Sequence, residues 1–288
     1  MNDIKLITLT ISSLLFASCT SDIDNTQVTS LSVKSPTIIE RSTVTPSFLH
    51  SLDRNQLVLD SYHDQAPTAW GEFIPGVKTK LDTSEKVIAL TLDACGGEHG
   101  SQYDEELINY LIDHSIPATL FINARWINHN SDQFLKLAND PLFQIENHGT
   151  EHRPLSVNGE VAWGIEGTHS IEEAYQEVMN NHQLITEKTG KEPTMFRPGT
   201  AYFDDISVRM LYDLNITPVN YSVLGDAGAT YTSNQVTDAL VNQAEPGSIA
   251  LLHMNQPNSG TAEGLKEAIP QLLDQGYSFV SLSDHPLK

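Results

Sequence analysis

Apolar runs typical of buried strands alternate with amphipathic stretches typical of helices from Lys86 to the carboxyl terminus. The runs are Val87–Asp93, Pro117–Asn123, Phe143–His148, Thr194–Pro198, Ile216–Val223, Ser248–His253 and Ser278–Leu282. The stretches between them include Asp104–Asp113, Ile171–Lys188 and Glu263–Gln275. Continuous apolar strands separated by helices predict an α/β fold with a parallel sheet that is covered on its outer face. Seven such strands over about 200 residues predict a closed or nearly closed barrel.

The first twenty residues have a different pattern, in which Met1 to Lys5 is short and polar and Leu6–Ala17 is an apolar run of twelve residues. Twelve residues cannot cross a bilayer core of about 30 Å, but they suit the apolar region of a cleaved export signal. The segment 15–19, Leu-Phe-Ala-Ser-Cys, resembles the lipobox of bacterial lipoproteins. This resemblance implies cleavage before Cys19 and attachment to a bacterial membrane through lipid on its sulfur. The alternative is a simple secretory signal in which Cys19 stands by chance, and both interpretations predict export to the cell envelope.

The remaining segments follow from composition. After a signal at residues 1–18, residues 19–45 are rich in Ser, Thr and Asp without an apolar period, which predicts a disordered tether. Residues 46–82 are expected to form a helical and loop extension that packs onto the main domain. Residues 83–288 are expected to be that domain.

Charge narrows the choice of partner. The chain has 288 residues with 16 Lys and Arg against 37 Asp and Glu, a formal net charge of −21. An acidic surface repels phosphate backbones, and without a basic stripe we expect no nucleic-acid partner. The two cysteines, Cys19 and Cys95, cannot form a disulfide scaffold.

Polar side chains stand where five of the predicted strands end. They are Asp93, His148, Arg197, Asp226 and His253. In parallel barrels the reacting groups gather at the carboxyl ends of the strands. The sequence therefore predicts one site at this rim.

His148 and His152 could face one divalent cation. With a third oxygen ligand and an open position for water, such a pair makes a catalytic rather than a structural metal site. The helix pattern of metalloproteases requires Glu directly after the first His, and Gly149 occupies that place. The alternative is a pair of solvated loop histidines.

Asp93 and Arg197 have two interpretations each. A carboxylate at the end of an apolar strand is costly to bury without a partner, so Asp93 could receive a proton from water or bind the metal itself; the alternative is a helix cap. Arg197 suits holding that carboxylate, and the alternative is a surface ion pair.

His253 is a candidate acid, because cleavage of an amide requires a proton for the departing nitrogen. Asp226 could orient its imidazole and raise its pKa. The alternative is a structural histidine bonded to a backbone carbonyl. Glu98, His99 and Asp104 lie near the first motif and are expected to be solvated loop residues.

In their order, these motifs resemble the polysaccharide deacetylase family, also called the NodB homology domain or carbohydrate esterase family 4. The resemblance runs from about Thr83 to the carboxyl terminus. Residues 91–95, Thr-Leu-Asp-Ala-Cys, stand in place of Thr-Phe-Asp-Asp-Gly, and residues 148–152 match the His-x-x-x-His spacing. Residues 197–200, Arg-Pro-Gly-Thr, are similar to the Arg-x-Pro-Tyr piece without its Tyr, and Leu252-His253 matches the closing Leu-His.

The resemblance implies a distorted (β/α) barrel, a divalent metal, often zinc, and removal of N-acetyl groups from an aminosugar polymer such as peptidoglycan or a chitin-like chain. Carried over by position, it implies Asp93 as base, His148 and His152 as metal ligands, Arg197 as the residue that orients Asp93, His253 as acid supported by Asp226, and the backbone N–H of Thr200 as oxyanion donor.

One departure from the family pattern matters for the metal. The second Asp of the first motif, a metal ligand in the family, is Ala94 here. Asp93 could bind the metal, Cys95 or a carboxylate such as Asp104 could replace the ligand, or water could fill the position. In an extended strand Asp93 and Cys95 point to the same side. We nevertheless expect a packing role for Cys95 and favour Asp93 near the metal.

Two other functions stay open at this point. Ala94 favours a non-catalytic glycan-binding lipoprotein, and a hydrolase of another non-peptide C–N bond could use the same fold.

Overall fold

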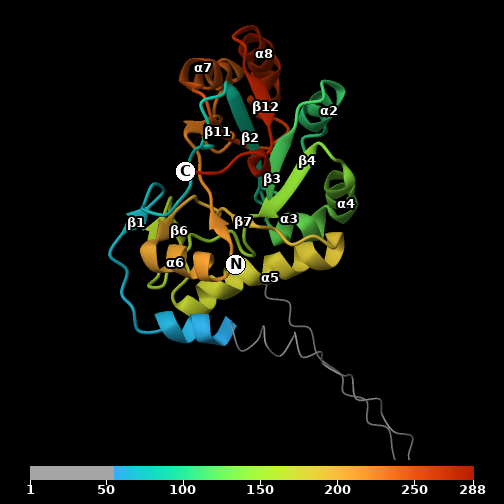
Figure 1. The fold of residues 1–288 in the computed structure, drawn as a ribbon. Coiled ribbons are helices and arrows are strands. Elements are labelled where there is room, and N and C mark those ends of the chain that lie inside the picture. Colours follow the sequence, from blue (N-terminus) through green and yellow to red (C-terminus); the bar gives the residue numbers. More distant parts are fainter. Residues whose placement is uncertain (1–54) are drawn as a thin grey trace, which may run out of the picture. The chain divides into compact units, whose positions relative to one another are not determined.

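The computed structural model describes residues 55–288 of the chain (Figure 1). The predicted export signal at residues 1–18, Cys19, the tether at residues 19–45 and the start of the extension, 46–54, lie outside the described residues. No helix within residues 55–288 combines the length and the apolar character needed to cross a membrane.

A parallel sheet forms the centre of the described chain (Figure 1). Its strands are β2 (Val87–Ala94), β3 (Ala118–Ile122), β4 (Phe143–Asn147), β7 (Met195–Phe196), β9 (Thr217–Pro218), β10 (Val223–Leu224), β11 (Ser248–His253) and β12 (Ser278–Val280). The hydrogen-bonded order is β10-β11-β2-β3-β4-β7-β9, and β12 pairs with the first residues of β2. The prediction of an α/β fold with about seven parallel strands in a distorted barrel is confirmed, as a curled half-barrel sheet.

Strand β2 explains why this sheet needs apolar side chains on both faces. All eight of its residues are buried. Ile88, Leu90, Leu92 and Ala94 pack in the core that also contains the side chains of the covering helices. The alternate residues face the interior of the barrel, where Val87 and Ala89 lie in one cluster with Phe121 of β3 and with Val219. The same inward face carries Thr91 and Asp93, so the strand delivers polar groups to the inside of the barrel.

The predicted strand Ile216–Val223 is wrong as a single element, because its two halves lie at opposite ends of the sheet order. The first half forms β9 next to β7, and the second forms β10 next to β11. Between them, Val219 N–H donates to Phe196 O at 2.9 Å, and Ser222 N–H donates to Ile249 O at 2.9 Å. Residues 219–222 therefore cross from one end of the sheet to the other, and the intervening carbonyls remain available to side chains inside the barrel.

Helices cover the outer face of the sheet (Figure 1). They are α2 (Glu105–Asp113), α3 (Ala124–His129), α4 (Ser131–Asn139), α5 (Ile171–Thr189), α6 (Asp205–Asp213), α7 (Ser233–Gln243) and α8 (Thr261–Asp274), followed by a 3₁₀ turn, η1 (Leu282–Asp284). The predicted helices at Asp104–Asp113, Ile171–Lys188 and Glu263–Gln275 correspond to α2, α5 and α8. Asp104 is the N-cap of α2 and accepts from Leu107 N–H at 2.9 Å.

The segment before the barrel packs onto it. Residues 55–62 are helical, and Val58 and Tyr62 are buried in a core shared with Phe203. Strand β1 (Trp70–Gly71) pairs with β8 (Phe203–Asp204) in an antiparallel two-stranded sheet. A hairpin of β5 (Val161–Ala162) and β6 (Ile165–Glu166) stands apart from the main sheet.

Glu146 joins β4 to β7 with its side chain. These strands share a single residue pair in the sheet, and the Glu146 carboxylate accepts from Thr194 N–H at 2.9 Å and from Met195 N–H at 2.7 Å. Glu146 is 3% exposed, and its burial raises its pKa to about 7. The folded chain therefore binds this proton more tightly than the unfolded chain, so the group adds stability at low pH that is lost as the pH rises toward 7.

Replacing Glu146→Gln should flatten this dependence. We expect the free energy of unfolding of the unaltered protein to fall between about pH 5 and about pH 8 by roughly 2 kcal/mol more than that of the variant, measured by urea unfolding. Glu187→Gln, an exposed change on α5, should keep the original slope. An identical slope in the Glu146→Gln variant would contradict the assignment.

Candidate active site

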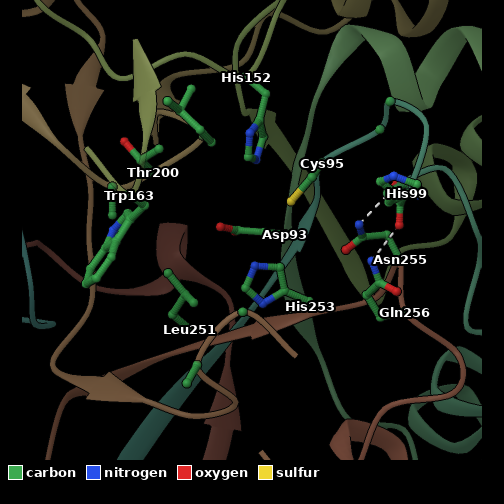
Figure 2. Close-up of a pocket in the computed structure, with 18 of the residues that line it drawn as sticks. Asp93, Cys95, His99, His152, Trp163, Thr200, Leu251, His253, Asn255 and Gln256 are labelled. Carbon is green, nitrogen blue, oxygen red and sulfur yellow. Dashed lines mark hydrogen bonds between the residues drawn. The ribbon is translucent and has the colours of Figure 1, made fainter. Parts of the chain in front are cut away.

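A pocket of about 650 Å³ lies at the carboxyl ends of β2 and β11. Asp93, Cys95, His152 and His253 point toward one another at its centre (Figure 2). Asp93 and His253 are register partners on the neighbouring strands β2 and β11, which explains how residues so distant in sequence meet. The picture places Trp163, Thr200 and Leu251 on one side of this centre and His99, Asn255 and Gln256 on the other (Figure 2).

Asp93 is bound by a fully buried cation. Arg197 Nη1 donates to Asp93 Oδ1 at 2.8 Å, and the two side chains are 0% and 4% exposed. The other oxygen, Oδ2, lies 3.7 Å from Nε2 of His148. One oxygen of Asp93 is therefore fixed by the barrel interior, while the other faces the histidines.

Arg197 uses the rest of its guanidinium to bind the segment 219–222 that crosses between the two ends of the sheet. Its Nε donates to Val219 O at 3.3 Å and its Nη2 to Asn220 O at 3.0 Å, which are carbonyls of the crossing segment. Nη1 also donates to Thr91 Oγ1 at 2.9 Å, and the group lies 4.2 Å from the centre of the Phe121 ring. This is not a surface ion pair, and the orientation of Asp93 is built into the fold.

Cys95, His148 and His152 form a candidate metal site. One ligand atom from each lies within 4.8 Å of the other two. Nδ1 of His148 donates to Arg197 O at 2.8 Å, which leaves Nε2 with a free lone pair. Nε2 of His152 is buried and has no hydrogen-bond partner among residues 55–288. A buried nitrogen without a partner, next to a second imidazole and a thiol, fits a divalent metal.

The imidazoles also change the chemistry of the thiol. Burial alone would raise the pKa of Cys95, but His152, His148 and His253 outweigh it and lower that pKa well below its ordinary value. Cys95 therefore lines the pocket among polar rings and is not packed as an apolar core residue.

The loop that carries His152 is held by a helix. His152 has a φ of 63°, a left-handed conformation that costs energy for a residue with a Cβ. The carboxylate of Glu177, on α5, accepts from the backbone N–H groups of Thr150, Glu151 and Arg153 at 2.9–3.2 Å. At Gly199 an added Cβ would lie 2.4 Å from His152, so only glycine allows the ring this close to residues 197–200.

His253 is backed by a buried carboxylate. Its Nδ1 lies 2.9 Å from Asp226 Oδ1, and its backbone N–H donates to Asp226 Oδ2 at 2.7 Å. Thr261 Oγ1 donates to the same Oδ2 at 2.9 Å. Burial would lower the pKa of His253, but Asp226 outweighs it and raises that pKa well above its ordinary value. Asp226 therefore favours the protonated form of this imidazole and holds it by Nδ1, and the ring lines the pocket.

Aromatic rings form one side of the pocket entrance. Trp163, at the turn of the β5–β6 hairpin, is 76% exposed, and its ring centre lies 6.1 Å from that of Tyr202. Tyr221 lines the pocket and donates to Glu72 Oε2 at 2.8 Å. The exposed ring of Trp163 beside a polar pocket is a surface on which a sugar ring can stack.

The structure brings most of the predicted site residues together. Asp93, Arg197, His148 and His152 form one connected set of contacts, and Asp226 and His253 form a second set at the end of the neighbouring strand. Thr200 lines the same pocket. Asp104 is not at the site and is not solvated, since it is a buried helix cap, so it is excluded as a replacement ligand. Glu98 and His99 are exposed, as expected, but line the pocket. Sequence analysis missed Glu177, whose only signal is an acidic residue on the buried face of α5.

Comparison with known proteins gives the family context. The polysaccharide deacetylase family matches residues 80–219. The peptidoglycan-N-acetylmuramic acid deacetylase PdaA of Bacillus subtilis is 28% identical over 211 residues, which cover 70% of this chain and 72% of that protein. A peptidoglycan-N-acetylglucosamine deacetylase of Bacillus cereus is 25% identical over 214 residues, 72% of this chain and 92% of that protein.

The fold also occurs in solved structures. A pseudoenzyme of carbohydrate esterase family 4 from Bacillus anthracis superposes with a TM-score of 0.60 at 22% identity, covering 74% of this chain and 69% of that one. Residues 80–219 are therefore similar to the polysaccharide deacetylase family, and the solved structure shows that the chain shares the fold of carbohydrate esterase family 4.

Proposed function

We propose that this protein is a metal-dependent hydrolase that removes N-acetyl groups from an aminosugar polymer of the peptidoglycan or chitin type. The observation that carries the proposal is the meeting, in one pocket, of a carboxylate held by a buried arginine, a set of metal-ligating side chains and an imidazole backed by a buried carboxylate. Glycan binding alone has no need of groups that transfer protons.

His148 and His152 would hold the metal, with a third ligand from the first motif. When bound there, a divalent metal, with zinc as our choice, supplies Lewis acidity toward the acetyl carbonyl and toward water. Asp93 would act as the base, with Oδ1 held by Arg197 and Oδ2 facing the histidines, where it can accept a proton.

The remaining roles concern the acetyl group and the leaving amine. The backbone N–H of Thr200, on the side of the pocket opposite His99 and Asn255 (Figure 2), would stabilise the oxyanion. His253, held protonated by Asp226, would donate its proton to the sugar nitrogen as the C–N bond breaks. Trp163 offers an apolar face for a sugar ring at the entrance.

The location we propose follows from the substrate. The two relatives named above are peptidoglycan deacetylases, and the first twenty residues carry an export pattern. A lipid on Cys19 and a tether over residues 19–45 would keep the domain at residues 83–288 close to a bacterial membrane and near the cell wall. Residues 46–82 would belong to the folded body, since Glu72 lines the pocket.

One observation favours a second function. Ala94 removes the carboxylate that the family pattern places in the metal site, and a fold neighbour is a pseudoenzyme. A non-catalytic glycan-binding lipoprotein is therefore the second candidate.

An acetate-release assay separates the two functions. We expect the full chain in mild detergent to release acetate from peptidoglycan glycan strands or from chitooligosaccharide, with loss of activity on chelation and recovery on adding zinc. Asp93→Asn should lower the rate by at least about 100-fold, whereas Asp113→Asn, an exposed change on α2, should not.

Asp93→Asn leaves Arg197 buried without its anion, so circular dichroism is used to check that this variant is folded. His253→Gln, at the end of the neighbouring strand β11, tests the same pocket without disturbing Arg197. Glycan binding without acetate release under every metal condition would overturn the hydrolase and favour the binding module.

The Glu177 contact generates a separate prediction on metal affinity. Replacing Glu177→Ala removes the acceptor for three backbone N–H groups of the loop that carries His152. We expect zinc affinity, measured by competition with a chelating dye, to fall by about 10-fold to 100-fold. Glu187→Ala on the solvent side of the same helix is the matched control. An unchanged zinc affinity in a folded Glu177→Ala protein would show that the loop keeps its conformation without this carboxylate.

A further inference from the structure

We propose that the third protein ligand of the metal is the thiolate of Cys95, so that the centre is Cys-His-His and selects thiophilic metals. This proposal rests on the metal dependence of the proposed function, but not on the acetyl-removing reaction. It differs from our expectation from sequence, which favoured Asp93 near the metal and a packing role for Cys95.

The backbone places Cys95 where the strand ends and the chain turns into the pocket. Strand β2 stops at Ala94, and Gly96 follows Cys95 with a φ of +70°. Arg125 Nη2 donates to the Cys95 carbonyl at 3.2 Å, which fixes the residue from the side of α3. The sulfur consequently points toward His152 and lies beside Asp93 (Figure 2).

The two imidazoles are prepared to share an ion with that sulfur. Sγ of Cys95 lies 3.9 Å from Nε2 of His148, and all three ligand atoms lie within 4.8 Å of one another. Ligand atoms on one tetrahedral zinc, at roughly 2.0–2.3 Å from the metal, are about 3.5 Å apart. Small side-chain movements would therefore bring both nitrogens and the sulfur onto one ion, and the pocket leaves a fourth position open.

Asp93 is less suited to this role because it already has a partner. Its Oδ1 forms a buried ion pair with Arg197, whose guanidinium the fold holds through three further hydrogen bonds. A metal bound to Asp93 would lie close to that fixed positive charge, which opposes binding. Among residues 55–288 the sulfur of Cys95 contacts imidazoles and no Lys or Arg side chain, so as a thiolate it can supply negative charge to the metal while Asp93 stays available for the proton.

Ala94 has no ligand atom for the metal, and the proposed centre does not require one at this position. It is 0% exposed and packs with the helix-facing core on the other side of β2. The ligand lost at that position is thus replaced from the next residue, which points into the pocket. A soft thiolate with two imidazoles favours Zn²⁺ and Co²⁺ over Mg²⁺ and Mn²⁺, which prefer oxygen ligands.

Cobalt spectroscopy tests this ligand directly. We expect metal-free full-length protein in mild detergent, titrated with Co²⁺, to develop intense near-ultraviolet absorption from sulfur-to-cobalt charge transfer, which Zn²⁺ then removes by displacement. Cys19→Ser should keep this absorption, which excludes the other cysteine as its source. Cys95→Ser should lose it and lower zinc affinity by on the order of 100-fold.

A second variant separates loss of the sulfur from misfolding, because it keeps a metal-binding side chain at position 95. Cys95→Asp should bind Co²⁺ without the charge-transfer absorption and should narrow the preference for Zn²⁺ over Mn²⁺ by at least about 10-fold, because a carboxylate is a harder ligand. Circular dichroism of both metal-free variants checks that they are folded.

The outcomes separate this proposal from the proposed function. Cobalt bound by unaltered protein without charge-transfer absorption, or absorption that persists in Cys95→Ser, overturns the thiolate ligand even if acetate is released. Charge-transfer absorption that depends on Cys95, together with no acetate release from any polymer, supports the thiolate ligand and contradicts the proposed deacetylase activity.

Discussion

A buried guanidinium is the constraint on which the pocket depends. Arg197 is 0% exposed, and a charge at that depth requires an anion and acceptors for its donors. It finds them in Asp93, in Thr91 and in two carbonyls of the crossing segment 219–222. Removal of one partner from such a buried pair typically costs about 3–5 kcal/mol. The arginine that binds the crossing segment therefore also fixes the carboxylate at the pocket.

The influence of Arg197 extends to the histidines through its main chain. Its carbonyl accepts from Nδ1 of His148, which sets the tautomer and the direction of Nε2. Its neighbour Gly199 allows His152 to lie against residues 197–200. The barrel interior thus orients Asp93 by a side chain and the two imidazoles by backbone contacts. A site arranged in this way is organised before any ligand binds, as catalysis by fixed charges requires.

The sequence predicted the parts of this fold that rest on local pattern. Strand β11 coincides with its predicted run, and β2, β3 and β4 differ from theirs by no more than one residue at either end, because burial on both faces requires a continuous apolar run. The short strands β7, β9 and β10 have two residues each, and their limits depend on tertiary partners such as Glu146. The run at residues 216–223 looks like one strand because both halves are buried, although they belong to opposite ends of the sheet.

The site shows the same division between local and distant information. Side chains at the ends of parallel strands could be expected to meet, which is why Asp93 and His253 were grouped correctly. Glu177 could not be found this way, since it acts from a helix on the backbone of a loop 26 residues earlier in the chain. Cys95 was expected to be a packing residue, but its side chain lines the pocket on the same side as Asp93, which is the side that the strand period indicates.

Charge balance in the pocket follows from these positions. Asp93 is neutralised by Arg197 and Asp226 by protonated His253, so neither carboxylate leaves excess charge at the centre. In the proposed Cys-His-His centre a single thiolate offsets only half of a divalent charge, so one positive charge remains. In a chain of net charge −21, that local excess lies where the acetyl oxygen would become negative during hydrolysis. If a carboxylate bound the metal beside the thiolate, its charge would cancel this remaining positive charge. Asp93 therefore has a physical reason to stay paired with Arg197 and not to bind the metal.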